Sequence, residues 1–290
     1  MTLAHETSYP RINADLTPQE MERVYSPTRK ELEFVEHVAK RSTARLGVLL
    51  HLKIFQRLGR FIPIRLIPDN ILAYIAGRAG YTRKVPRKQI DQYDTSGSKR
   101  EHLADIRRYL NVKPVNAAAR AWLREQAIAL CQTKHLVPEL IDALCETLVL
   151  HRYELPGFST IDDIASQVRE EVHDGYLTEI AQAMSAQAKT RIDRLLIVVD
   201  GNTTAWQGLK RDPRRPTNKA VRAYLHHLAE LKDIADLLPK IKMPQSKMRF
   251  FRSYAQSLDA SELKDHTQRY ALAAIFIVAQ RAKALDDAAD

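Results

Sequence analysis

Residues 44–58 read ARLGVLLHLKIFQRL, and this stretch decides the fold class. Apolar residues cover most of the circumference of the helix that it would form, namely Leu46, Val48, Leu49, Leu50, Leu52, Ile54 and Phe55. A helix that is apolar on nearly every side is buried among other elements. We therefore predict a buried helix here.

Helix signals extend outward from this stretch in both directions. Thr17 and Glu20 form a capping box, and Ser26 begins a second helix. Downstream, Pro68 opens a helix that Gly80 would end. The flanking segments are therefore predicted to be helical as well.

The remaining periodic segments are also read as helices. Residues 96–110 and 115–133 form a helix–short turn–helix pattern, and Asn111 lies where a left-handed cap is expected. Further helices are predicted over 137–151, 159–184, 217–231, 244–258 and 261–285. No alternating strand pattern exceeds a few residues, so the predicted fold class is all-α, built from several small helical modules.

Composition limits the class of protein. The chain has 290 residues, of which 45% are hydrophobic, and a formal net charge of +10, as is typical of globular and not of disordered chains. It has two cysteines and no Cys-x-x-Cys pair, which excludes a disulfide scaffold and structural zinc from the prediction. The longest apolar run, residues 270–279, is too short to cross a bilayer, and no signal peptide is recognised. We expect a cytoplasmic protein.

The positive charge is unevenly distributed along the chain. Residues 78–134 and residues 205–255 each carry a net charge of +8, whereas residues 135–204 between them carry −7. Two basic blocks separated by an acidic one indicate two positive surfaces on a modular protein.

In the first basic block, one helix face carries arginines. Arg100, Arg107 and Arg108 surround the small residue Ala104, so this face could approach a phosphate backbone or a groove closely. The accompanying cations are Lys99 in the first turn of the helix and, in a preceding proline-containing loop, Lys84, Arg87 and Lys88. The alternative interpretation is an ordinary solvated basic face.

The second basic block is more specific. Residues 206–219 read WQGLKRDPRRPTNK, a proline-stiffened basic loop that leads into a helix N-terminus, where a phosphate is readily bound. In that helix Asn218, Lys219 and Arg222 lie away from the apolar stripe, and Asn and Arg side chains read adenine and guanine edges. The alternative is a basic loop that grips an acidic helix of the same chain, such as residues 160–180.

The cations of both blocks point to duplex DNA as the ligand. No aromatic residues alternate with the cations of the second block, as they do in proteins that bind single strands. The residues predicted to contact duplex DNA are Lys84, Arg87, Lys88, Lys99, Arg100, Arg107, Arg108, Lys210, Arg211, Arg214, Arg215, Thr217, Asn218, Lys219, Arg222 and Lys247.

Residues that could carry chemistry are few. Residues 195–199 resemble a buried strand that ends in Asp200, but no second carboxylate pattern accompanies it. His226 and His227 are adjacent and point to different helix faces, so they do not form a metal site on their own. No nucleophile elbow, P-loop or zincin motif occurs, and we predict no catalytic residue, metal or cofactor.

Five strings, in this order, resemble the N-terminal part of the Tn3-family replicative transposases. They are RLGVLLHLKIFQRLGRF at 45–61, SGSKREHLADIRRYLNV at 96–112, LHRYELPGFSTIDDIA at 150–165, WQGLKRDPRRPT at 206–217 and RYALAAIFIVAQRAKALDD at 269–287. The ELPGFST and LKRDPRRPT segments are long enough to be specific. Asn111 stands where many members of the family have glycine, which is compatible with the same turn.

The resemblance implies a helical region that binds the terminal inverted repeats of a transposon. It implies tandem helix-turn-helix modules similar to those of centromere-protein-B-type proteins. The catalytic DDE domain of such transposases lies downstream and nothing here matches it, so this part would bind DNA ends without cutting them. A bacterial, nucleoid-associated protein is expected, with no membrane partner.

We accordingly expect four modules and leave two other functions open. The modules are an N-terminal helical DNA-binding module at 1–80, a second helix-turn-helix module with a basic face at 81–155, an acidic helical connector at 156–204, and a third helical module with a basic loop and a recognition-type helix at 205–290. One alternative is an interaction module with non-specific DNA affinity, which self-associates through the acidic segment and the apolar helix at 270–279. The other is an all-α enzyme that uses Asp200.

Overall fold

The structure is a computed structural model that describes residues 2–81, 86–199, 203–210, 226 and 229–289. Its regular elements are helices, apart from a small antiparallel hairpin of two strands, β1 (Val198–Val199) and β2 (Thr203–Thr204). The predicted all-α class is therefore confirmed.

The chain divides into two compact units. Unit 1 comprises Met1–Ala127 and Val137–Ser166, and unit 2 comprises Ile128–Leu136 and Gln167–Asp290. The finer division into four functional modules stays a prediction.

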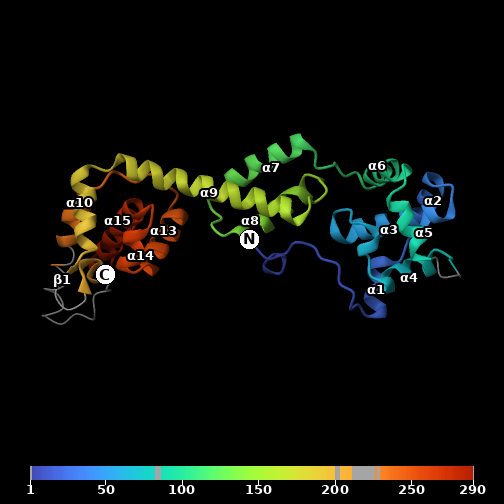
Figure 1. Cartoon of the computed structure of the whole chain (residues 1–290), viewed down its shortest axis with the longest axis horizontal. Helices are drawn as coiled ribbons and strands as arrows, with labels where there is room; N and C mark the ends of the chain where they lie inside the picture. Colours follow the sequence, from blue (N-terminus) through green and yellow to red (C-terminus); the bar gives the residue numbers. More distant parts are fainter. Residues whose placement is uncertain (1, 82–85, 200–202, 211–225, 227–228, 290) are drawn as a thin grey trace. The chain divides into compact units, whose positions relative to one another are not determined.

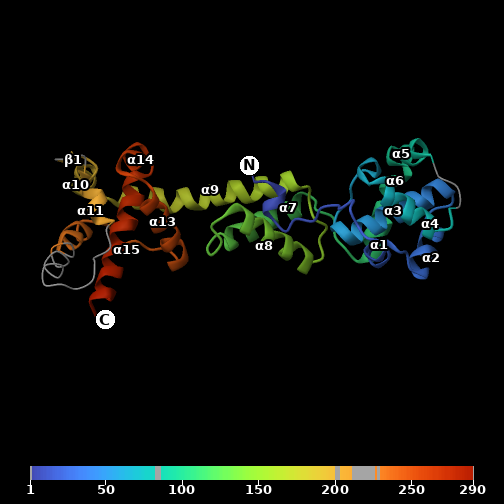
Figure 2. The same cartoon turned by 90° about the horizontal axis from the view of Figure 1, so that it is seen from below.

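Unit 1 is built around the apolar stretch that decides the fold class. Its helices are α1 (Pro18–Tyr25), α2 (Arg29–Val38), α3 (Ser42–Leu58), α4 (Asp69–Arg78), α5 (Arg87–Asp94), α6 (Ser98–Leu110), most of α7 (Ala117–Leu130), α8 (Val137–Leu150) and the start of α9 (Phe158–Ala183), with 3-10 turns η1 (Ala4–Glu6) and η2 (Ile64–Leu66). Helix α3 contacts α1, α2, α4, α5 and α6, which gather around it in both views (Figures 1 and 2). Residues 46–55 are all buried, as predicted.

The helix ends in unit 1 follow local signals. Thr17 and Glu20 form the predicted capping box of α1. A second capping box at Thr28 begins α2, two residues beyond the predicted start at Ser26. Asn111 adopts the left-handed conformation (φ 52°, ψ 52°) at the end of α6, as expected.

The segment after α8 joins distant parts of unit 1. The Leu155 amide donates a hydrogen bond to the Gly59 carbonyl at the end of α3 (2.7 Å), and the Tyr9 hydroxyl donates to the Pro156 carbonyl. The Tyr9 ring also lies edge-on to Phe158, with 5.2 Å between ring centroids. The ELPGFST string is thus a structural junction of unit 1.

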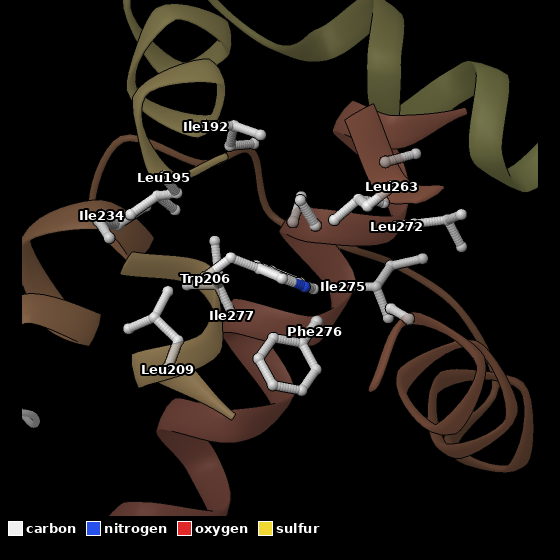
Figure 3. Packing of buried hydrophobic residues seen from close by; sticks show 14 of the residues in the cluster. Ile192, Leu195, Trp206, Leu209, Ile234, Leu263, Leu272, Ile275, Phe276 and Ile277 are labelled. Carbon is white, nitrogen blue, oxygen red and sulfur yellow. The ribbon is translucent and has the colours of Figure 1, made fainter. Parts of the chain in front are cut away.

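Unit 2 has its own core around Trp206. Its elements are the rest of α9, α10 (Ala186–Leu195), the β1–β2 hairpin, α11 (Ala205–Leu209), α13 (Gln245–Ser257), α14 (Ala260–Asp265) and α15 (Arg269–Ala289), and residues 229–235 are also helical. Trp206 is fully buried and packs beside Phe276 (Figure 3), with 4.8 Å between the ring centroids. Its indole nitrogen donates a hydrogen bond to the Leu258 carbonyl at 3.4 Å.

Two apolar segments of unit 2 differ from the sequence-based interpretation. Residues 271–277 of α15 are 0% exposed within the core of unit 2, so this face is not free to pack on a second copy. In contrast, Ile197 and Val198 are 56% and 60% exposed, and β1 has only two residues. Residues 195–199 therefore do not form one buried strand, and Asp200 lies outside the described residues.

Candidate nucleic-acid interface

A short connection joins α5 to α6. The three residues Thr95, Ser96 and Gly97 separate the helices, and the Ser96 hydroxyl donates a hydrogen bond to the Tyr93 carbonyl (2.7 Å). Both helices pack on α3, where Gly47 leaves room for the Tyr93 ring; a Cβ there would lie 2.3 Å from it. The connection has the length and glycine content of a helix-turn-helix turn, but it lies before the α6–α7 connection that the sequence pattern suggested.

Helix α6 buries one face and exposes another. His102 and Ile106 are buried, whereas Arg100, Ala104 and Arg108 are exposed at successive four-residue steps. Because Ala104 is small, a ligand can approach the helix backbone between the two guanidinium groups. Two of the three predicted arginines thus share the exposed face, and Arg108 also pairs with Asp105 of its own helix.

The third arginine, Arg107, turns toward the segment after α8. Its Nε donates a hydrogen bond to Glu154 (2.9 Å), and its guanidinium lies 4.9 Å above the Phe61 ring. Glu154 also accepts a hydrogen bond from the Val115 amide (3.2 Å). One carboxylate therefore connects α6 to the loop that leads into α7, and Arg107 acts here as an internal ion-pair partner.

Lys99 is engaged in a second internal cluster. Its Nζ lies 2.8 Å from an oxygen of Asp94, which also lies 3.2 Å from Nε2 of the buried His51 and accepts a hydrogen bond from the Ile64 amide. Burial alone would raise the pKa of Asp94, but its hydrogen bonds from His51, Lys99 and Ile64 hold that pKa at about 2. Burial lowers the pKa of His51, which favours the neutral imidazole. This cluster fixes the start of α6 on α3.

Arg87 and Lys88 lie in α5 and not in the predicted loop. Ile90 and Tyr93 are buried three residues apart, and a proline precedes the first turn, which together explain the helix. The Arg87 guanidinium pairs with Asp69 (2.6 Å) and donates hydrogen bonds to three carbonyls in residues 64–67. Arg87 therefore holds α5 in place, while Lys88 is exposed.

The predicted cations of unit 2 that the structure describes turn inward. Lys210 donates a hydrogen bond to the Leu258 carbonyl, and burial lowers its pKa. Lys247 is 0% exposed, and in the described part of the chain no carboxylate lies within ion-pair distance of its ammonium group. Burial lowers the pKa of Lys247 too. Lys247 is therefore not the surface lysine that we expected. It could contact DNA only if this region opened.

The other predicted contact residues cannot be placed on this surface. Outside the described residues lie Lys84, Arg211, Arg214, Arg215, Thr217, Asn218, Lys219 and Arg222. Their contacts with DNA stay predictions.

Sequence reasoning missed Glu154 and Asp94 as organising residues. Glu154 is separated from Arg107 by 47 residues, and Asp94 from His51 by 43. The only available signal was the position of Glu154 at the start of the ELPGFST string. Nothing local marked Asp94.

Neither a metal site nor a membrane span is found in the part of the chain that the structure describes. No three His, Cys, Asp or Glu side chains there are placed to hold a metal ion. No helix there is long and apolar enough to cross a membrane.

Comparison with known proteins shows that the sequence of the chain is similar to transposases. The chain is 22% identical, over all of its length, to the transposase for transposon gamma-delta of Escherichia coli (strain K12), of which it spans 29%. It is 24% identical, over 77% of its length, to the transposase for transposon Tn501 of Pseudomonas aeruginosa, of which the match spans 23%. The chain thus spans less than a third of these relatives, and the resemblance to Tn3-family transposases is confirmed. A family profile described as Domain of unknown function (DUF4158) matches residues 1–168, more than half of the chain, so the protein belongs to the DUF4158 family.

Proposed function

We propose that this chain binds duplex DNA at the terminal inverted repeats of a transposon, as the N-terminal part of a replicative transposase. The observation that supports this best is the exposed face of α6, on which Arg100 and Arg108 flank Ala104. The similarity to the transposases for transposon gamma-delta and transposon Tn501 also supports it. Cutting and joining of DNA strands belong, in this proposal, to regions outside these residues.

Helix α6 is the proposed reading helix. In helix-turn-helix proteins the second helix enters the major groove while the first crosses the backbone. Arg100 and Arg108 can each donate two hydrogen bonds to a guanine edge, and Arg108 would exchange its pairing with Asp105 for this contact. Lys88, exposed on α5, would bind a phosphate.

The paired cations of unit 1 support this surface from inside. Arg87, Lys99 and Arg107 each hold α5 or α6 through a carboxylate. An ion pair that fixes a helix also fixes the direction in which the side chains of its other face leave the backbone. We therefore assign these three residues to positioning, and the contact with DNA to Lys88, Arg100 and Arg108.

The basic loop of unit 2 is proposed as a second contact. Arg211, Arg214 and Arg215 would bind phosphates, whereas Asn218 and Arg222 would read bases. Arg215→Ala is then expected to weaken binding to every sequence alike. Arg222→Ala is expected to relax selectivity at one or two base pairs.

Titration of two labelled duplexes tests the proposal. A terminal inverted repeat and a scrambled duplex of equal length are compared at several salt concentrations. We expect the affinity for both to fall steeply with salt, and the terminal repeat to bind about 1,000-fold more tightly. Equal affinity for the two duplexes would contradict sequence-specific binding.

A further inference from the structure

A row of stacked side chains lies where α7 meets the segment after α8 in unit 1. The Trp122 ring stacks on Tyr153 (5.2 Å between centroids, 29° between planes) and contacts His151 edge-on at 5.0 Å. The Lys113 ammonium lies 5.0 Å from the centre of the Tyr153 ring. We call Lys113, Tyr153, Trp122 and His151 the aromatic ladder.

Backbone contacts hold the aromatic ladder in place. The Lys113 amide donates a hydrogen bond to the Arg152 carbonyl (2.7 Å), and the Glu154 amide donates to the Lys113 carbonyl (2.9 Å). Nδ1 of His151 lies 2.9 Å from the Thr147 carbonyl, which orients the imidazole ring. The rings are therefore fixed before any ligand binds, which lowers the entropy lost on binding.

The surface beside the aromatic ladder is both apolar and basic. Leu150 is 79% exposed and Val149 is 63% exposed, and His151, Arg152 and Lys113 are exposed as well. Among the described residues, no carboxylate lies within ion-pair distance of Lys113 or Arg152. The exposed positive charge is thus available to an anionic ligand.

Rings and unpaired cations on one surface are the combination by which proteins bind unpaired nucleic-acid strands. Bases stack on rings, and cations contact the phosphates between them. Lysine, in contrast, is depleted in protein–protein interfaces, and the exposed Lys113 lies at one end of the aromatic ladder. The chemistry of this surface therefore fits a single strand better than it fits an apolar protein partner.

We propose that the aromatic ladder binds single-stranded DNA. A base stacks on the exposed His151 at the outer end of the ladder, and the adjoining phosphates contact Arg152 and Lys113. This ligand differs from the duplex assigned to α6, so the proposal extends the proposed function to strands that are unpaired at a DNA end. The sequence did not indicate this, because only the fold brings Trp122 beside residues 151–153.

Tryptophan fluorescence reports directly on the aromatic ladder. The only other tryptophan, Trp206, is fully buried in the core of unit 2. We expect a thymidine oligonucleotide of about 15 nucleotides to quench Trp122 emission, and an abasic oligonucleotide of equal length to quench it less. In the Trp122→Phe variant, which keeps Trp206, the quenching is expected to disappear.

A pair of histidine variants tests the stacking of a base, and an arginine variant tests the phosphate contact. We expect His151→Ala to weaken binding of the oligonucleotide about 10-fold, because one stacked base is lost. His37→Ala, which changes an exposed histidine of α2, is the control and should leave binding unchanged. Arg152→Ala should weaken binding of both the thymidine and the abasic oligonucleotide.

Four results would overturn the proposal. The first three are an absence of Trp122 quenching, equal quenching by the abasic strand, and equal effects of His151→Ala and His37→Ala. A Trp122 emission that depends on protein concentration without DNA would show that a second copy covers the surface instead, and would also overturn it. The duplex titration uses other variants, so a failure of this proposal and a failure of the proposed function are distinguishable.

Discussion

The two units treat their internal charges differently. In unit 1, Arg107 pairs with Glu154, and the buried Lys53 lies 3.3 Å from Glu31. Unit 2 instead buries Lys247, for which the described residues supply no carboxylate partner. A paired charge can stay ionised inside a protein, whereas an unpaired one favours its neutral form. The buried lysine of unit 1 thus has a carboxylate within ion-pair distance, and the buried lysine of unit 2 has none among the described residues.

The buried histidines of the two units differ as well. In unit 1, Nε2 of His51 lies 3.2 Å from an oxygen of Asp94. His173 of unit 2 packs against the rings of Phe250 and Phe251, at 5.3 and 5.0 Å, and its Nε2 has no hydrogen-bond partner among the described residues. Burial, together with the positive charge of Lys247 and Arg169, lowers the pKa of His173 to about 3. In unit 1, Arg87, Lys99 and Arg107 are each paired with a carboxylate, whereas in unit 2 the positive charges of Lys247 and Arg169 disfavour protonation of His173.

The largest expected effect on stability comes from breaking the Arg107–Glu154 pair. Glu154→Ala leaves a half-buried guanidinium and the Val115 amide without their acceptor, and we expect unit 1 to lose about 3 kcal/mol of unfolding free energy. Urea denaturation followed by Trp122 emission measures this. Glu154→Gln, which keeps an acceptor, should lose less. An unchanged transition for Glu154→Ala would show that this ion pair does not stabilise unit 1.

The same substitution at each of the two buried lysines is expected to change stability in opposite directions. Lys247→Met removes an unpaired buried cation and is expected to stabilise unit 2 by about 2 kcal/mol. Lys53→Met removes the cation that pairs with Glu31, which keeps only its hydrogen bonds from Gln56 and the Thr28 amide, and is expected to destabilise unit 1. Trp206 emission, read in the Trp122→Phe background, follows unit 2. If both variants changed the unfolding free energy in the same direction, this would contradict the proposed difference between the units.

The third effect is a pH dependence of unit 2. His173 has an ordinary pKa of 6.5 and a folded pKa of about 3, so its contribution to stability is complete above pH 6.5 and is lost as the pH falls toward 3. For Asp94 of unit 1, the ordinary pKa of 3.8 falls to about 2, so its contribution is lost only between about pH 4 and 2. Because burial also lowers the pKa of His51, this residue adds a loss to unit 1 in the same direction as His173.

Urea midpoints of the two units between pH 7.5 and 4 measure this difference. We expect the midpoint of unit 2 to fall more than that of unit 1. His173→Phe should flatten the curve of unit 2 in this range. A curve that keeps its slope in His173→Phe would mean that another group causes the dependence.

The smallest effect is expected at the turn after α6. Asn111 has φ 52°, a conformation that glycine adopts without strain. Asn111→Gly is expected to change the stability of unit 1 by less than about 1 kcal/mol, whereas Asn111→Ala should lower it by about 1 kcal/mol. The Trp122 transition checks both. A large loss for Asn111→Gly would show that the asparagine side chain makes a necessary contact.

The helices of unit 1 were predictable where their signals are local. The capping box at Thr17 and the all-round apolar stretch 44–58 are contained within a few turns of sequence. Helix α2 starts later than predicted because Thr28 forms a reciprocal capping box with Glu31. Helix α5 was read as a loop because only Ile90 and Tyr93 mark its buried side.

The roles of the cations were less predictable, because charge spacing does not show which partner the fold supplies. Arg107 shares a sequence face with Arg100, yet its carboxylate comes from after α8. Lys247 was a different case. It stands four residues before Phe251 and eight before Ala255, and all three are buried on one side of α13. This four-residue spacing is visible in the sequence and is typical of a buried helix face, but the basic residues around Lys247 favoured a surface position.

The proposed reading role of α6 is tested most directly by one ratio, the affinity for a terminal-repeat duplex divided by that for a scrambled duplex. In the Arg100→Ala/Arg108→Ala double variant we expect this ratio to fall by about 10- to 100-fold, because two base-edge contacts are lost. In Lys88→Ala, the phosphate-contact control, both affinities should fall alike and the ratio should stay constant. An unchanged ratio in the double variant would contradict the assignment of sequence reading to α6.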